Sequence, residues 1–199
     1  MRKLKLQVQM SIDGYVAGPN GEMDWMIFNW DDGLNNYVKK LTEPVDCIVL
    51  GRKLAEVFIP YWAGIAANPK DPEHEAGKKF TNTPKVVFTK TLCKSEWDNT
   101  ILAYANIVDE INDLKNQDGG EIIAYGGATF VSSLIKSGLI DEFHLFINPT
   151  ANGNGMPIFK ALESKLDLKL IKSTAFECGI VVLHYEPNGL KSTENGLIA

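Results

Sequence analysis

The chain has 199 residues, 45% of them hydrophobic and 23% charged, which is the size and composition of a single globular domain. Its formal net charge is -5 and it holds no run of Lys or Arg, which argues against a general nucleic-acid-binding protein, because such proteins bind largely by neutralising phosphates. No apolar run approaches the length of a membrane span and the N-terminus does not resemble a signal peptide, so we expect a cytoplasmic protein that acts on a small molecule.

Hydrophobic periodicity predicts an α/β fold. Eight segments have the β-branched runs or alternation typical of strands: Lys5–Met10, Asp46–Leu50, Lys85–Thr89, Thr100–Tyr104, Glu121–Ala124, Glu142–Asn148, Leu166–Thr174 and Gly179–Tyr185. About four segments have helical spacing: Leu34–Leu41, Lys53–Ile59, Ile107–Leu114 and Ala128–Ser137. Strands and helices alternate until the last two strands, which follow each other directly. We therefore predict a mixed, mostly parallel sheet whose last two strands pair antiparallel.

The first predicted strand ends in a turn-rich loop that leads to Asp24 and Trp25. A loop fixed at a strand end commonly carries function. Asp13 in this loop has two interpretations, a carboxylate that bonds loop N–H groups in an Asx turn, or a catalytic acid. Trp25 either lines a substrate pocket or fastens the loop to the core. We take Asp24 and Trp25 as candidate substrate-binding residues.

Asp31 and Asp32 directly precede the first predicted helix. N-capping of that helix is their ordinary explanation, and catalysis is the alternative, for which Asp32 is the candidate. Aromatic side chains that could stack on a flat ring are Trp25, Trp30, Tyr61 and Trp62, although packing in the core or in loops also explains each of them. Tyr61 is the third candidate for substrate binding.

The second predicted strand runs into Gly51, Arg52 and Lys53. Arg52 and Arg2 are the only arginines in the chain, and arginine is the side chain that binds phosphate bidentately. The helix that begins here is expected to stop at Pro60. The following stretch, Tyr61–Pro84, lies outside the predicted sheet and is either a lid over the site or a solvated excursion.

The fifth predicted strand runs into Tyr125, Gly126 and Gly127, then into a helix that starts with Ala128 and Thr129. Such a turn points bare N–H groups and a helix N-terminus at one spot, where a pyrophosphate can approach closely. The alternative is that the glycines only permit a tight turn.

A third strand end carries Thr89 and Lys90. In a mostly parallel sheet the carboxyl ends of these three strands meet at one edge, which is where open α/β sheets bind ligands. Arg52, Thr89 and Lys90 are candidates for holding a ribose 2′-phosphate, which favours NADPH over NADH. The competing interpretation is a pair of solvated charges.

Cysteine and histidine give no metal-binding spacing. These residues are scattered along the chain at Cys47, Cys93, Cys178, His74, His144 and His184. We interpret the cysteines as packing residues and predict no metal site.

Together these segments resemble the dihydrofolate reductase-like fold, and in particular the C-terminal domain family of the riboflavin-biosynthesis reductase. The resemblance runs from Met10–Gly14 to Gly179–Tyr185 and is most specific at Gly126–Phe130 and Leu134–Glu142, with Pro149, Gly153 and Gly155 in the loop that follows. It implies a three-layer fold over 1–186, followed by a polar tail at 187–199. It also implies a homodimer.

The resemblance implies that NADPH phosphates lie against Gly51, Arg52, Lys53, Thr89, Lys90 and the stretch Tyr125–Thr129. Asp13 and Trp25 would then face the nicotinamide and the substrate. The implied activity is reduction of a pterin- or aminopyrimidine-like ring, similar to 5-amino-6-(5-phosphoribosylamino)uracil reductase or dihydrofolate reductase. Two positions depart from the riboflavin reductases. Tyr125 stands where they usually have Glu, and the stretch Met26–Asp32 lacks the Arg that they carry after the Trp. The resemblance therefore does not identify the substrate. The alternative is a protein of the same fold that binds nucleotide or flavin without catalysis.

Overall fold

The computed structural model describes residues 1–189, which form one eight-stranded sheet and five helices. The strands are β1 Leu4–Ser11, β2 Val45–Gly51, β3 Lys85–Phe88, β4 Thr100–Ala103, β5 Glu121–Tyr125, β6 Glu142–Asn148, β7 Leu168–Ala175 and β8 Val181–Pro187. The helices are α1 Asp32–Thr42, α2 Arg52–Ala67, α3 His74–Asn82, α4 Ile107–Asn116 and α5 Ala128–Lys136. The tail predicted at 187–199 lies outside the described residues from position 190 on.

The strand order in the sheet is β4-β3-β2-β5-β1-β6-β8-β7. The six strands β1 to β6 are all parallel to one another. Strand β8 is antiparallel to both of its neighbours, β6 and β7. This confirms the predicted α/β class and the mixed, mostly parallel sheet, including the antiparallel pairing of the last two strands.

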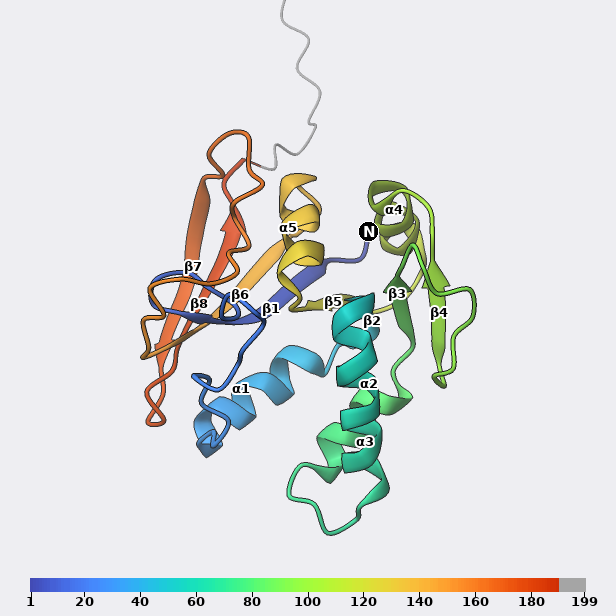
Figure 1. Cartoon of the computed structure of the whole chain (residues 1–199), viewed down its shortest axis with the longest axis horizontal. Coiled ribbons are helices and arrows are strands. Elements are labelled where there is room, and N and C mark those ends of the chain that lie inside the picture. Colours follow the sequence, from blue (N-terminus) through green and yellow to red (C-terminus); the bar gives the residue numbers. More distant parts are fainter. Residues whose placement is uncertain (190–199) are drawn as a thin grey trace, which may run out of the picture.

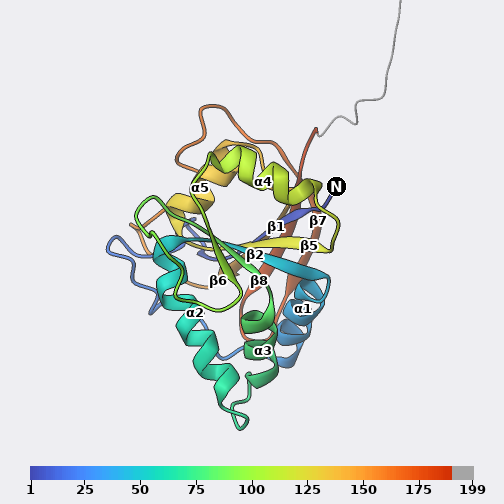
Figure 2. The same ribbon diagram turned by 90° about the vertical axis from the view of Figure 1, so that its right-hand side faces the viewer.

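Helices cover both faces of the sheet, so the molecule has three layers (Figure 1, Figure 2). Helices α4 and α5 pack on one face, over a core that includes Leu6, Val49 and Ile122. Helices α1, α2 and α3 lie on the other face, over residues such as Ile48 and Ile123. The two cores alternate along each strand because successive side chains point to opposite faces.

The helix expected to stop at Pro60 continues to Ala67, so that prediction is wrong. A proline inside a helix removes one backbone hydrogen bond and crowds the preceding turn. Pro60 is on the exposed side of α2, while Ile59 and Ile65 are buried. Burial of the apolar side chains on both sides of the proline therefore outweighs the local cost.

The stretch 61–84 is not a loop, because it contains the second half of α2 and the whole of α3, which the sequence analysis did not predict. The helices pack against each other, and a Cβ atom at Gly77 would lie 2.7 Å from Ile65 Cγ2 and 2.8 Å from the backbone of Ala66. The glycine that weakens the helical pattern in the sequence is thus what allows the two helices to approach. No helix within residues 1–189 is long and apolar enough to cross a membrane.

Candidate functional site

Five parallel strands end along one edge of the sheet and bring the predicted residues together there. The last residues of these strands are Gly51 on β2, Phe88 on β3, Tyr125 on β5, Ser11 on β1 and Asn148 on β6. Adjacent strands lie about 4.8 Å apart, so the row from β3 to β1 spans roughly 14 Å. The predicted convergence of the strand ends is therefore present, and it creates a surface long enough for an extended ligand.

The two glycine turns after β2 and β5 pack against each other. A Cβ atom at Gly51 would lie 2.8 Å from Cβ of Phe130 on α5, and one at Gly127 would lie 3.8 Å from Cβ of Leu54 on α2. Gly127 also has φ +86°, a conformation that favours glycine, whereas Gly126 has neither a positive φ nor a close neighbour. Packing and backbone conformation thus explain two of the glycines, and Gly126 needs another reason.

Helices α2 and α5 begin at these turns without the usual capping groups. Their N-caps are Gly51 and Gly127, no side chain of residues 1–189 caps them, and neither first turn contains an acidic residue. By contrast, Asp31 caps α1 and Asn106 caps α4, and both of those helices have acidic residues in the first turn. Uncapped N–H groups and the positive end of the helix dipole favour an anion at both turns.

The basic side chains predicted to hold phosphate surround the β2 and β3 ends. Arg52 forms an ion pair with Glu56, one helical turn further along α2, at 2.7 Å. Lys53 and Lys90 are exposed. Thr89 is buried, and its hydroxyl oxygen accepts hydrogen bonds from the N–H groups of Thr91 and Leu92, both at 3.1 Å, so this side chain shapes the turn.

The side chain of Tyr125 points away from the turn and into an aromatic cluster beneath the sheet. Its ring lies 5.5 Å from that of Phe58 and 6.1 Å from that of Phe80, measured between centroids. Burial raises the pKa of its hydroxyl well above the ordinary value. Any contact of Tyr125 with a ligand at the edge would therefore come from its backbone.

Asp13 joins the loop after β1 to the loop after β6. Its carboxylate accepts hydrogen bonds from the hydroxyl of Ser11 at 2.6 Å and from the N–H groups of Gly153 at 2.6 Å and Asn152 at 3.1 Å. These bonds hold the pKa of the carboxyl below its ordinary value, and the bond from Ser11 has the largest effect. The ionised carboxylate fixes the relative position of the two loops.

Asp31 and Asp32 occupy different positions at the start of α1. Asp31 is the N-cap and accepts hydrogen bonds from the N–H groups of Leu34 and Cys178, both at 2.8 Å. Those bonds lower the pKa of its carboxyl, and the bond from Cys178 has the largest effect. Asp32 is exposed and lines a hollow of about 580 Å³ with Trp30 and Glu177 among its other walls.

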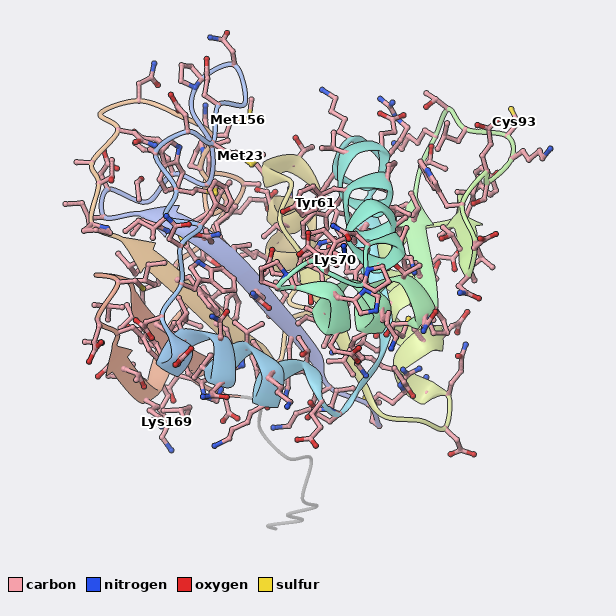
Figure 3. All side chains as sticks on the ribbon, turned by 90° about the horizontal axis from the view of Figure 1, so that it is seen from below. Met23, Tyr61, Lys70, Cys93, Met156 and Lys169 are labelled. Atoms are coloured by element: carbon pink, nitrogen blue, oxygen red, sulfur yellow. The ribbon has the colours of Figure 1, made fainter. Side chains whose placement is uncertain are left out.

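This hollow adjoins the same sheet edge, because the turn between β7 and β8 forms one of its walls and β8 starts opposite the end of β6. The ring of Trp30 stacks on Phe146 of β6 with centroids 6.2 Å apart. Side chains of Asp24 and Tyr61 are exposed, and Trp25 is half-buried with its indole N–H donated to the carbonyl of Glu22 at 3.2 Å. Figure 3 shows Tyr61 on α2 and Met23 on the loop that carries Asp24 and Trp25.

Ser11 and Asn148 belong to this edge but were not predicted as site residues. Asn148 is fully buried, accepts a hydrogen bond from the N–H of Ile27 at 2.8 Å and donates one to Gln9 at 3.1 Å. It therefore fixes the loop before α1 to the end of β6. A polar residue that closes an apolar strand, followed by Pro149, is the sequence signal that points to it.

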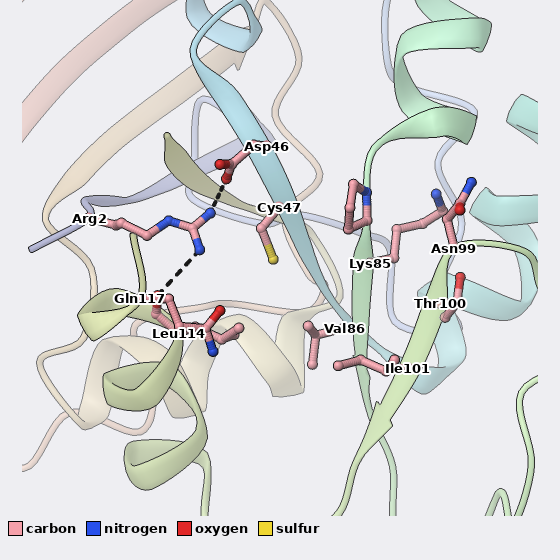
Figure 4. A pocket seen from close by; sticks show the side chains of 11 residues that line it. Arg2, Asp46, Cys47, Lys85, Val86, Asn99, Thr100, Ile101, Leu114 and Gln117 are labelled. Atoms are coloured by element: carbon pink, nitrogen blue, oxygen red, sulfur yellow. Dashed lines mark hydrogen bonds and ion pairs between the residues drawn. The ribbon is translucent and has the colours of Figure 1, made fainter. Parts of the chain in front are cut away.

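A second hollow, of about 410 Å³, lies at the opposite edge of the sheet, where β2, β3 and β4 begin (Figure 4). Arg2 forms one wall, with an ion pair to Asp46 and a hydrogen bond to the carbonyl of Leu114 at 3.3 Å. Lys85 in another wall donates its three N–H groups to carbonyls of Phe80, Thr81 and Thr83. Because these charged groups are committed to protein partners, we do not place the site here.

Comparison with known proteins gives a family match over almost the whole chain. The model of the RibD C-terminal domain matches residues 2–182. The uncharacterized protein YyaP of Bacillus subtilis is 34% identical over 191 residues, which cover 94% of this chain and 96% of that protein.

Solved structures show the same fold. A putative riboflavin biosynthesis protein from Shewanella sp. PV-4 is 25% identical with a TM-score of 0.69, over 95% of this chain and all of that one. Dihydrofolate reductase from Enterococcus faecalis, solved with NADP(H) and RAB-propyl, has 16% identity and a TM-score of 0.60, over 94% of this chain and 97% of that one. The fold is thus similar to that of dihydrofolate reductase, as the resemblance predicts.

Proposed function

Because the chain belongs to the RibD C-terminal domain family, we propose that it is an NADPH-dependent reductase of a small pterin- or aminopyrimidine-like ring. The observation that supports this most is the pair of uncapped helix N-termini that begin side by side at Gly51 and Gly127. Two such ends suit a pyrophosphate, which carries more than one negative charge. The similar dihydrofolate reductase structure, which holds NADP(H), supports the choice of nucleotide.

The row of strand ends suggests how the nucleotide lies. The pyrophosphate occupies the turns of β2 and β5, which leaves Lys90 and Arg52 on one side for the ribose 2′-phosphate. On the other side the nicotinamide reaches the ends of β1 and β6, about two strand spacings or 10 Å from the β5 turn. Lys53, Thr89, Ala128 and Thr129 complete the proposed phosphate contacts.

The substrate ring is proposed to bind beside the nicotinamide, next to Asp24, Trp25 and Tyr61, and within reach of the hollow at the start of α1. When bound, NADPH supplies the hydride, so the protein needs to orient the two rings and supply a proton where one is required. Of the two candidate acids Asp13 and Asp32, Asp32 is better placed to form a hydrogen bond to an amino-substituted ring, because its carboxylate is exposed to the hollow. Asp13 acts in this proposal as a positioning residue, because its carboxylate is held ionised by the loop bonds.

The test is NADPH oxidation, followed by the loss of absorbance of the reduced nicotinamide, with a panel of pterins and aminopyrimidines. We expect turnover with at least one ring, NADPH preferred over NADH, and loss of that preference in Arg52→Ala. The matched control is Lys40→Ala, which removes an exposed charge from the distal end of α1 and should leave the preference intact.

Three results would contradict the proposal. Tight nucleotide binding with no turnover of any ring would favour a protein that binds NADPH without catalysis, and a yellow protein as purified would indicate a flavin. If neither nucleotide binds, the reductase proposal fails although the fold stands.

A further inference from the structure

A cluster of ionisable side chains lies outside the proposed reductase site, on the face of the sheet that α1 covers. Glu142 and His144 are on β6, and His184 is the register partner of His144 on the antiparallel strand β8 (Figure 1). Oε2 of Glu142 is 3.3 Å from Nε2 of His144 and 3.7 Å from Nε2 of His184. The atoms that these three residues would offer a metal all lie within 4.8 Å of one another.

Two buried polar atoms in this region lack a hydrogen-bond partner within residues 1–189, namely Nε2 of His184 and Oε1 of Gln7. Gln7 is the register partner of His144 on β1, and it shares a face with Lys5, whose ammonium is 3.8 Å from Glu142. An unpaired buried polar group destabilises the folded state, because it has lost its hydrogen bonds to water without replacement. Folded proteins rarely leave such groups without a partner, so both atoms are available to bind a ligand.

The surrounding side chains orient the cluster. The hydroxyl of Tyr37 on α1 is 2.7 Å from Nδ1 of His144, and an N–H donated from Nδ1 leaves the lone pair of Nε2 directed at Glu142. Lys3 donates a hydrogen bond to Oε1 of Glu142 at 2.6 Å, which leaves Oε2 facing the histidines. Partners of this kind fix the tautomer and direction of metal ligands in proteins.

We propose that Glu142, His144 and His184 bind a divalent transition-metal ion, with zinc as the metal best suited to two imidazoles and one carboxylate. A tetrahedral zinc site has ligand atoms about 3.3 Å apart, a separation that Glu142 and His144 already show. The His184 ring is stacked on that of His144 with centroids 4.3 Å apart, so in this proposal it tilts out of the stack to direct its Nε2 at the metal. Water or Oε1 of Gln7 supplies the fourth ligand.

Neighbouring charges set the strength of the site. Lys3 and Lys5 contribute two positive charges, and Glu121, Glu142 and Glu186 contribute three negative ones. The ammonium of Lys5 repels a metal on Oε2 of Glu142, so we expect Lys5→Met to bind zinc more tightly than the wild type. His144 is four positions before Asn148, the last residue of β6, which is about 13 Å along the strand, so the metal joins β6 to β8 and takes no part in hydride transfer.

The experiment is a zinc titration of the chelator-treated full chain by calorimetry, together with the visible absorption of the cobalt-loaded protein. We expect one zinc per chain, and at least about a 100-fold loss of affinity in His184→Gln. We expect about a 10-fold loss in Tyr37→Phe, which keeps the ligands but removes the partner of His144. The matched control is His74→Gln, which removes the remaining histidine and should change nothing.

A nitrogen NMR spectrum of the wild-type chain provides a second test that does not depend on how the variants fold. One equivalent of zinc should shift the Nε2 nitrogen resonances of His144 and His184 and leave those of His74 in place. The proposal is overturned if the wild type binds no zinc in the titration, if binding survives unchanged in His184→Gln, or if the His74 resonances shift instead.

Discussion

The three glycines at the sheet edge have different physical reasons to be glycine. At Gly51 a side chain would collide with Phe130, and at Gly127 the backbone has φ +86°. At Gly126 a Cβ atom would have Leu54 Cδ2 at 3.9 Å as its nearest neighbour, which is ordinary contact. Folding alone therefore does not require glycine at 126, whereas the phosphate that we propose to bind here would require it in order to approach the backbone closely.

We predict that Gly126→Ala leaves the stability within about 0.5 kcal/mol of wild type and weakens NADPH binding about tenfold or more, because the added methyl group covers the anion site. Gly127→Ala should instead lose about 1–2 kcal/mol of stability, because alanine is strained at positive φ. Urea unfolding and nucleotide titration of both variants separate the two effects. Unchanged NADPH affinity in Gly126→Ala would place the phosphates elsewhere.

Glu56 competes for the arginine that we assign to the ribose phosphate. Because Arg52 is paired with Glu56 at 2.7 Å, Glu56→Gln should release the guanidinium and strengthen NADPH binding by about two- to threefold, with little effect on NADH. Measuring both dissociation constants at low and high salt checks this. An equal change for the two nucleotides would show that Arg52 does not meet the 2′-phosphate.

Asp31 provides a pH-dependent contribution to stability. Its folded pKa lies below the ordinary value near 3.8, because the N–H groups of Cys178 and Leu34 bind the ionised carboxylate. The stabilisation is therefore complete above that value and is lost as pH falls through the folded pKa. We expect Asp31→Ala to lower the urea midpoint at pH 7 and the difference from the wild type to shrink progressively as the pH falls below 3.8. A midpoint difference that is constant with pH would contradict this.

At the scale of elements, α3 is held by contacts that the local sequence does not reveal. The ammonium of Lys85 is buried at the start of β3 and donates to the carbonyls of Phe80, Thr81 and Thr83 at 3.0, 2.9 and 2.7 Å. It thereby satisfies the carbonyls at the C-terminal end of this short helix.

We predict that Lys85→Met costs about 3 kcal/mol of stability, because it leaves buried carbonyls without donors. Chemical unfolding measures the loss. The matched control is Lys78→Met. Lys78 lies on α3 itself, and its ion pair with the exposed Glu75 contributes little to stability. If Lys85→Met is as stable as Lys78→Met, the carbonyl contacts do not hold the helix.

The strand ends and the first half of α2 were predictable from sequence, because the pattern there is local, whereas the second half of α2 and the whole of α3 were not. Apolar runs that stop at Gly51, Thr89 and Tyr125 show where parallel strands end, and parallel topology makes those ends meet. Pro60 and Gly77 are unfavourable in isolated helices, so propensity argues against α2 continuing past Pro60 and against α3, and only the burial of their shared face reverses that. Local pattern thus predicts where the strands at this edge end, while tertiary packing decides these two helical segments.

At the scale of the whole molecule, register and strand order place side chains that are remote in sequence. Asp13 is 139 residues from Asn152, and His144 is 40 from His184, yet both pairs meet because β1 lies beside β6 and β6 beside β8. No spacing in the chain predicts either contact. The alternation of strands and helices predicts the class of fold, but the order of the strands decides which residues share an edge or a face.

The most direct test of the nucleotide site is to follow the backbone amide resonances of the labelled chain while NADPH is added. We expect the largest shifts at Gly51, Gly126, Gly127 and Thr89, with smaller shifts at the ends of β1 and β6. Shifts confined to the hollow at the opposite edge, around Thr100 and Asn99, or no shifts at millimolar NADPH, would contradict it.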